Sequence, residues 1–107
     1  MSSEDLLPID DPLTAELAAA EWMRRLGFVD AYADGVPGPD GGIDVESAEG
    51  LAQVKHYANP VGIAEIQRLA GISYERDKEG LFFALNGYTR QAVGADPVSL
   101  TRFGYAA

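Results

Sequence analysis

Three polar side chains with complementary chemistry occur at short spacing near the middle of the chain: Asp44, Gln53 and Lys55. Polar and apolar residues alternate over residues 43–45 and 51–57, on either side of a short turn, which predicts a β-hairpin. If the numbers of the residues paired across this hairpin sum to about 97, Asp44 lies opposite Gln53, and Lys55 follows Gln53 on the same face of the second strand. A carboxylate, an amide oxygen and an ammonium then converge on one patch.

Such a patch suits the hydrolysis of a phosphodiester. Carboxylate and amide oxygens are hard ligands for Mg²⁺, and a cation held by few protein groups keeps waters and takes phosphate oxygens. Lys55 could offset the negative charge that develops during attack. Glycosidic cleavage fits less well, because it uses two carboxyls across a sugar and gives the lysine no task. Glu46 shares the Asp44 face and is a further candidate. The alternative is an ordinary solvated hairpin face, which often carries Asp, Gln and Lys.

Composition narrows the chemistry further. The 107 residues include no cysteine, which excludes disulfides, thiolate zinc sites and cysteine nucleophiles. They include one histidine, His56, so there is no cluster of imidazoles. Seventeen acidic against eight basic residues give a net charge of −9, which disfavours a broad basic surface for nucleic acid. No apolar run is long enough to span a bilayer, and residues 1–11 are too polar for a secretory signal, so we expect a cytoplasmic protein without a membrane partner.

The elements that must position these residues indicate an α/β fold, a mixed β-sheet flanked by helices. Residues 1–11 read as a flexible acidic lead, and residues 12–107 as a single domain. In the first helix Leu13, Leu17 and Ala20 would form the buried stripe, with Glu16 on its margin. Gly80 would end the second helix. The expected order is a helix over 13–26, strands over 28–32, 43–45 and 51–57, a helix over 60–77, a strand over 81–85, a helix over 89–94 and a strand over 98–103.

Four segments together resemble the Mrr-like restriction endonuclease domain of the PD-(D/E)xK nuclease superfamily, and the similarity covers nearly the whole chain from Leu13. The segments are Gly41-Gly-Ile-Asp-Val45, Ala52-Gln-Val-Lys-His-Tyr57, Pro60-Val-Gly62 and Ile66-Gln-Arg-Leu-Ala-Gly71. The resemblance implies a restriction-endonuclease-like core (α-β-β-β-α-β-α-β) and a catalytic set of Glu16, Asp44, Gln53 and Lys55. It also implies that Glu16, Asp44 and Gln53 bind Mg²⁺, for which Mn²⁺ substitutes, and that the substrate is DNA.

Other polar residues have two readings each. Gln67, Arg68 and Arg90 are candidate DNA contacts, although each could equally be an ordinary surface residue. The glycine- and proline-rich segment 34–42 more readily lets the backbone approach DNA than binds Ca²⁺ through Asp34, Asp40 and Asp44, because its spacing does not match a calcium loop. His56 points to the face opposite Lys55, which favours a structural role, and Glu21 with Arg25 reads as a surface ion pair.

The sequence is therefore compatible with two functions. The first is a metal-dependent DNA endonuclease of restriction or defence, as a homodimer or part of a larger assembly, because cutting two strands needs two active sites. The second is a catalytically weak or inactive module of the same fold that binds DNA or a protein, since Gln53 contributes no charge. With so few bases, we expect weak, metal-dependent DNA binding of shallow salt dependence.

Overall fold

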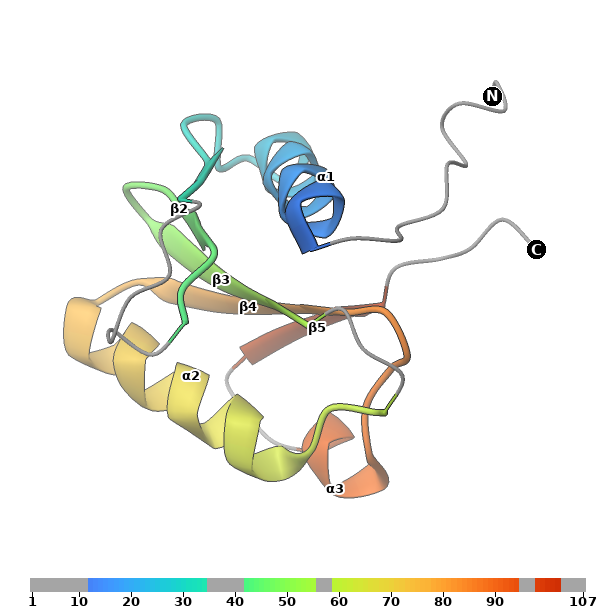
Figure 1. The fold of residues 1–107 in the computed structure, drawn as a ribbon. Coiled ribbons are helices and arrows are strands. Elements are labelled where there is room, and N and C mark those ends of the chain that lie inside the picture. The colour runs from blue at the N-terminus through green and yellow to red at the C-terminus, as the bar shows by residue number, and fades with distance from the viewer. Residues whose placement is uncertain (1–11, 35–41, 56–58, 95–97, 103–107) are drawn as a thin grey trace.

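The computed structural model describes residues 12–34, 42–55, 59–94 and 98–102, and all structural statements below refer to these ranges. One helix covers one face of a five-stranded sheet, and two helices cover the other (Figure 1). The elements, in chain order, are α1 (Pro12–Arg25), β1 (Tyr32–Ala33), β2 (Val45–Glu46), β3 (Gly50–Lys55), α2 (Ile63–Arg76), β4 (Glu79–Ala84), α3 (Arg90–Val93) and β5 (Val98–Arg102).

The sheet has the order β1-β2-β3-β4-β5 and is mixed, as expected. β1, β2 and β3 are antiparallel neighbours, whereas β4 is parallel to both β3 and β5. Helix α2 provides the crossover from β3 to β4, and α3 the crossover to β5. The order of elements and the fold class are confirmed, although the first strand is two residues long and begins only at Tyr32. No helix in the described ranges is long and apolar enough to cross a membrane.

Helix α1 buries a face that only partly matches the expected one. Its side chains against the sheet are Ala15, Ala19, Ala20 and Met23, all essentially inaccessible to solvent, whereas Leu13 and Leu17 are 58% and 53% exposed. The prediction is confirmed for Ala20 and wrong for Leu13 and Leu17, because it gave weight to the largest apolar residues, although small alanines allow the closest approach of a helix to a sheet. Glu16 consequently belongs to the buried face, since it precedes Ala19, Ala20 and Met23 at helical spacing.

Helix α2 begins and ends at backbone features that hydrophobic periodicity does not reveal. Val61 pairs with Gly87 and Thr89 through backbone hydrogen bonds of 2.9 Å each, so the helix starts at Ile63 instead of residue 60. It ends at Arg76, next to the expected end, and the following residue, Asp77, has a left-handed φ of 56°. Gly80, expected as the stop, lies inside β4, where a Cβ atom would collide with the Oγ of Ser73. This glycine allows the end of α2 to pack directly on the sheet.

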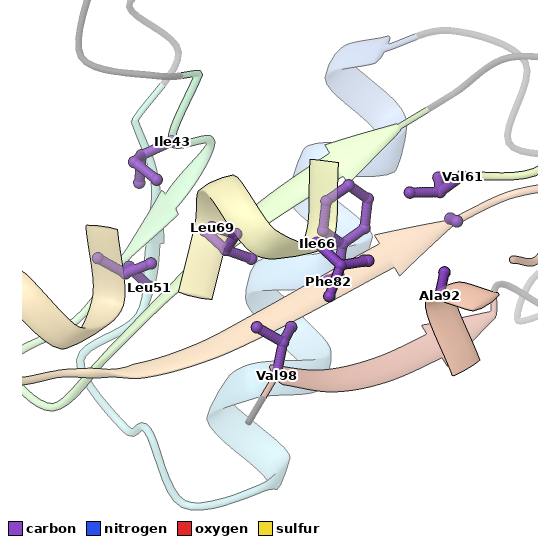
Figure 2. Close-up of a cluster of buried hydrophobic side chains, with 9 residues drawn as sticks. Ile43, Leu51, Val61, Ile66, Leu69, Phe82, Ala92 and Val98 are labelled. Atoms are coloured by element: carbon purple, nitrogen blue, oxygen red, sulfur yellow. The ribbon is translucent and has the colours of Figure 1, made fainter. Parts of the chain in front are cut away.

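The core is divided between the two faces of the sheet. On the α2 face, Ile66 and Leu69 pack against Leu51, Phe82 and the residues around them, and Ala92 adds a contribution from α3 (Figure 2). The α1 face holds a second cluster of Ala19, Ala20, Met23, Ala31, Val45, Ala52, Leu81 and Phe83. Alternate residues of β3 therefore point to different helices, with Leu51 toward α2 and Ala52 toward α1.

Candidate functional site

Asp44 lies where β2 and β3 part. The hairpin pairs Val45 with Ala52, which is the expected register, and the next pair in that register would be Asp44 with Gln53. The amide of Asp44 still donates to the Ala52 carbonyl at 2.9 Å. Its carboxylate Oδ2, however, accepts a 2.7 Å hydrogen bond from the backbone N–H of Val54. A side-chain oxygen thus takes the place of a strand carbonyl and fixes the carboxylate against β3, between Gln53 and Lys55.

Glu16 approaches Asp44 from helix α1. The pKa of the Glu16 carboxyl is raised above its ordinary value, first by partial burial, then by the negative charge of Asp44 and a side-chain hydrogen bond with it. Glu16 and Asp44 therefore lie close enough to interact, and the structure brings together these two of the four expected catalytic residues.

Asp34 is a third acidic residue near this pair. Its backbone N–H donates to the Asp44 carbonyl at 2.8 Å, and its charge adds to the rise in the pKa of Glu16. The sequence suggested Asp34 only as a possible calcium ligand. Its proximity to Asp44 could not be predicted, because it depends on the pairing of β1, which ends one residue before Asp34, with β2. Within the ranges that the structure describes, no three Asp, Glu, His or Cys side chains are grouped closely enough to hold a metal ion.

Gln53 lies on the α2 side of β3 and is 1% exposed. Its Nε2 atom lies 3.1 Å from the place that a Cβ at Gly42 would occupy, and Arg68 Nη2 lies 4.0 Å from the same place. Gly42 also has a φ of +75°, which side-chain-bearing residues rarely adopt. The glycine thus lets the chain before Asp44 pass close to the Gln53 amide, and it brings the guanidinium of Arg68 to the same corner.

Lys55, the last residue of β3, also points to the α2 side. Its Nζ lies 3.5 Å from Oε1 of Glu65, a residue in the first turn of α2, and the two side chains are 25% and 31% exposed. The sequence indicated Lys55 but not Glu65, since nothing in the pattern of α2 shows that its first turn faces the end of β3. The ammonium is therefore held from the helix, on the opposite face of the sheet from α1.

The remaining candidates fall into two groups. Gln67 and Arg90 are exposed on α2 and α3, which lie on the same side of the sheet as Lys55 and Arg68 (Figure 1). Glu46 was a candidate for the site but does not join it. Its carboxylate lies 3.2 Å from Arg76, the last residue of α2, and 3.3 Å from Lys78.

Three further sequence interpretations concerned the pair of Glu21 and Arg25, and Asp40 and His56. The exposed pair of Glu21 and Arg25 is confirmed at 3.4 Å, and Arg24 contacts the same carboxylate at 2.8 Å. Asp40 and His56 lie outside the described residues.

Comparison with known proteins gives one family. The sequence-family model of the Mrr catalytic domain, which is described as a restriction endonuclease, matches residues 11–95, most of the chain. No curated protein and no solved structure matches the chain significantly.

Proposed function

Because the chain belongs to the Mrr catalytic domain family of restriction endonucleases, we propose that it is a Mg²⁺-dependent enzyme that hydrolyses phosphodiester bonds in DNA. The observation that carries the proposal is the approach of Glu16 to Asp44, whose carboxylate is held by the Val54 N–H on the strand that bears Gln53 and Lys55. With this activity we propose a role in restriction or defence, acting on DNA in the cytoplasm.

The donor atoms near Asp44 fit a divalent cation with hard ligands. Two carboxylates that lie close together repel each other, and a divalent cation bound between them relieves that repulsion. Glu16 and Asp44 would hold Mg²⁺, with the side-chain oxygen of Gln53 as a neutral third ligand, and Mn²⁺ would substitute. When bound, the cation supplies positive charge against the phosphate oxygens during hydrolysis.

The residues on the α2 side supply the remaining groups. Lys55 would hold the attacking water by hydrogen bonding and offset the charge that develops on the phosphate. Arg68, at the corner of Gly42 and Gln53, would bind a neighbouring phosphate, since a guanidinium matches two of its oxygens at once. Gln67 and Arg90 would contact the DNA backbone further along the same side. These few contacts, in a chain of net charge −9, support DNA binding that needs the cation and varies little with salt.

The test is plasmid cleavage by the wild type and three variants, with Mg²⁺ or Mn²⁺. We expect Asp44→Asn and Lys55→Met to lose cleavage. Asp77→Asn, which removes the same charge from an exposed left-handed position that asparagine tolerates, should cleave like the wild type. Wild type that leaves DNA intact, or Asp44→Asn that cleaves it equally well, would refute the proposal.

One observation favours the alternative of a non-catalytic DNA- or protein-binding module. Gln53 is neutral, and the described ranges hold no group of three acidic or imidazole side chains for a metal. This module would bind DNA without cleaving it and without tight cation binding. Isothermal titration calorimetry with Mn²⁺ separates the two functions. A nuclease should bind Mn²⁺ as the wild type and lose this binding in Asp44→Asn, whereas a non-catalytic module should show no such binding in the wild type or in the variant.

The arrangement of the whole chain is part of the proposal. We take residues 12–107 as one nuclease domain after an acidic lead of residues 1–11. A homodimer or a larger assembly would place two such sites on the two strands of DNA. Sedimentation of the protein with and without a DNA duplex measures this directly, and a monomer that nicks one strand only would contradict it.

A further inference from the structure

The ion pair between Lys55 and Glu65 joins the proposed site to helix α2. Lys55 Nζ and Glu65 Oε1 lie 3.5 Å apart, and both side chains are more than two-thirds buried, at 25% and 31% exposure. The surface pair of Arg25 and Glu21 is much more exposed, at 68% and 53%. Because solvent screens an exposed pair more strongly, the Lys55–Glu65 pair is the more strongly coupled of the two.

Glu65 has a fixed position from which to act. It stands in the first turn of α2, where the helix dipole favours a negative charge. The next residue, Ile66, is fully buried in the core beneath the helix, and Leu69 anchors the following turn (Figure 2). The carboxylate is therefore tied to the core by its neighbours, and its reach toward the end of β3 is set by the packing of α2 on the sheet.

Lys55, in contrast, has a side chain with four rotatable bonds at the last position of a strand. An unrestrained lysine ammonium samples many rotamers and is strongly hydrated, so it spends little time in any one orientation. A group that must hold one water or one phosphate oxygen acts efficiently only when it is already oriented. The carboxylate on α2 provides that restraint from the side opposite to Glu16.

We infer that Glu65 is a positioning residue: its carboxylate holds the Lys55 ammonium in the orientation that the proposed cleavage of DNA requires. This inference rests on the proposed nuclease function. It concerns the rate of the reaction on bound DNA, not DNA affinity, because Glu65 carries the same sign of charge as the phosphates and cannot attract them.

The composition of the chain makes a direct readout of the ammonium practicable, since Lys55 and Lys78 are its two lysines. Protein labelled with ¹⁵N and ¹³C in lysine alone would give two side-chain signals. Lys78 is an internal reference, because its ammonium contacts Glu46 and the Ser47 carbonyl. Glu65→Gln should shift and mobilise the Lys55 signal while that of Lys78 stays in place. Glu75→Gln, an equal change at an exposed position of the same helix, should move neither signal.

The same variants test the effect on the reaction. At saturating DNA with Mg²⁺, Glu65→Gln should lower the cleavage rate constant by about fivefold to tenfold, as expected for loss of one partly buried ion pair. Its Kd for DNA, measured with Ca²⁺ in place of Mg²⁺, should stay within about twofold of wild type or become tighter. Glu75→Gln should match wild type in both measurements.

The outcomes separate this inference from the proposed function. An unchanged Lys55 signal in Glu65→Gln, or a cleavage rate equal to wild type despite a shifted signal, would overturn the positioning role while the nuclease function stands. A wild-type protein that leaves DNA intact would overturn the nuclease function and, with it, any part of the ion pair in cleavage.

Discussion

Substitution of Asp44 by Asn is expected to stabilise the protein while it removes the activity. The Val54 N–H donates to Asp44 Oδ2 at 2.7 Å, and the carbonyl oxygen of an asparagine can accept the same bond. The substitution also removes the charge that opposes Glu16. At about pH 8 without metal, we expect the free energy of unfolding to rise by about 0.5–1 kcal/mol, the size of one carboxylate interaction near a surface. The melting temperature should rise by about 2–6 °C.

Asp44→Ala should change the stability in the opposite direction. Alanine offers no acceptor, so the Val54 N–H loses its partner at a partly buried position. The expected loss is about 1–3 kcal/mol of unfolding free energy, the usual penalty for such a group. Cleavage of plasmid DNA with Mg²⁺ should fall by about a hundredfold or more in both variants, because both lack the carboxylate.

The measurements are urea unfolding at about pH 8 and about pH 4, without metal, and plasmid cleavage with Mg²⁺. The gain in Asp44→Asn should shrink at the acidic pH, because more of the Glu16 carboxyl is protonated there and the repulsion from Asp44 is weaker. Asp77→Asn controls for the loss of one negative charge elsewhere. Equal destabilisation by Asn and Ala would refute the role of the Val54 hydrogen bond, and a gain that does not change with pH would refute the repulsion between the carboxylates.

Three further outcomes follow from single contacts. The folded protein raises the pKa of Glu16 above its ordinary 4.5, so in the metal-free protein the free energy of unfolding should fall as pH rises above that value. Urea unfolding across pH would measure this fall, and Glu16→Gln should make it smaller. Gly42→Ala should cost about 1–2 kcal/mol in chemical denaturation, because φ is +75° and the new Cβ would press on Gln53; an unchanged midpoint would contradict this. Tyr88→Phe should cost about 1–3 kcal/mol and leave cleavage by the folded protein intact, because the Tyr88 hydroxyl accepts from Thr101 N at 3.1 Å and lies 2.8 Å from the Phe82 carbonyl. Loss of cleavage without loss of stability would show that Tyr88 acts in the site.

The sequence predicted best those features that depend on neighbours in the chain. The register of the hairpin followed from its turn, where Ser47 Oγ accepts a 2.9 Å hydrogen bond from the Gly50 N–H. The parting of β2 from β3 at Asp44 could not be predicted, because it depends on β1 and on a side chain that replaces a backbone acceptor. The alternation of polar and apolar residues along a strand shows which face each residue occupies, but it does not show where the hydrogen bonding between two strands ends.

Features set by packing between distant segments were the hardest to predict. The exposed Leu17 and the buried Ala19 reverse the order that hydrophobicity suggests, since proximity to the sheet selects for small size. Gly80 was taken for a helix stop because the contact that requires it comes from Ser73. Glu65 was missed for the same reason, as its partner lies ten residues earlier on another element. Each of these needed the position of a second segment.

The alanine face of α1 has a consequence for how the site could be adjusted. Ala15, Ala19 and Ala20 set how far the helix axis stands from the sheet, and Glu16 is carried on that axis. Replacing one of them with valine would lift the helix, and a displacement of about an ångström is enough to weaken a metal site or a catalytic contact substantially. The affinity for a cation that we propose for Glu16 and Asp44 would therefore be adjustable through apolar volume alone, at buried positions that carry no charge.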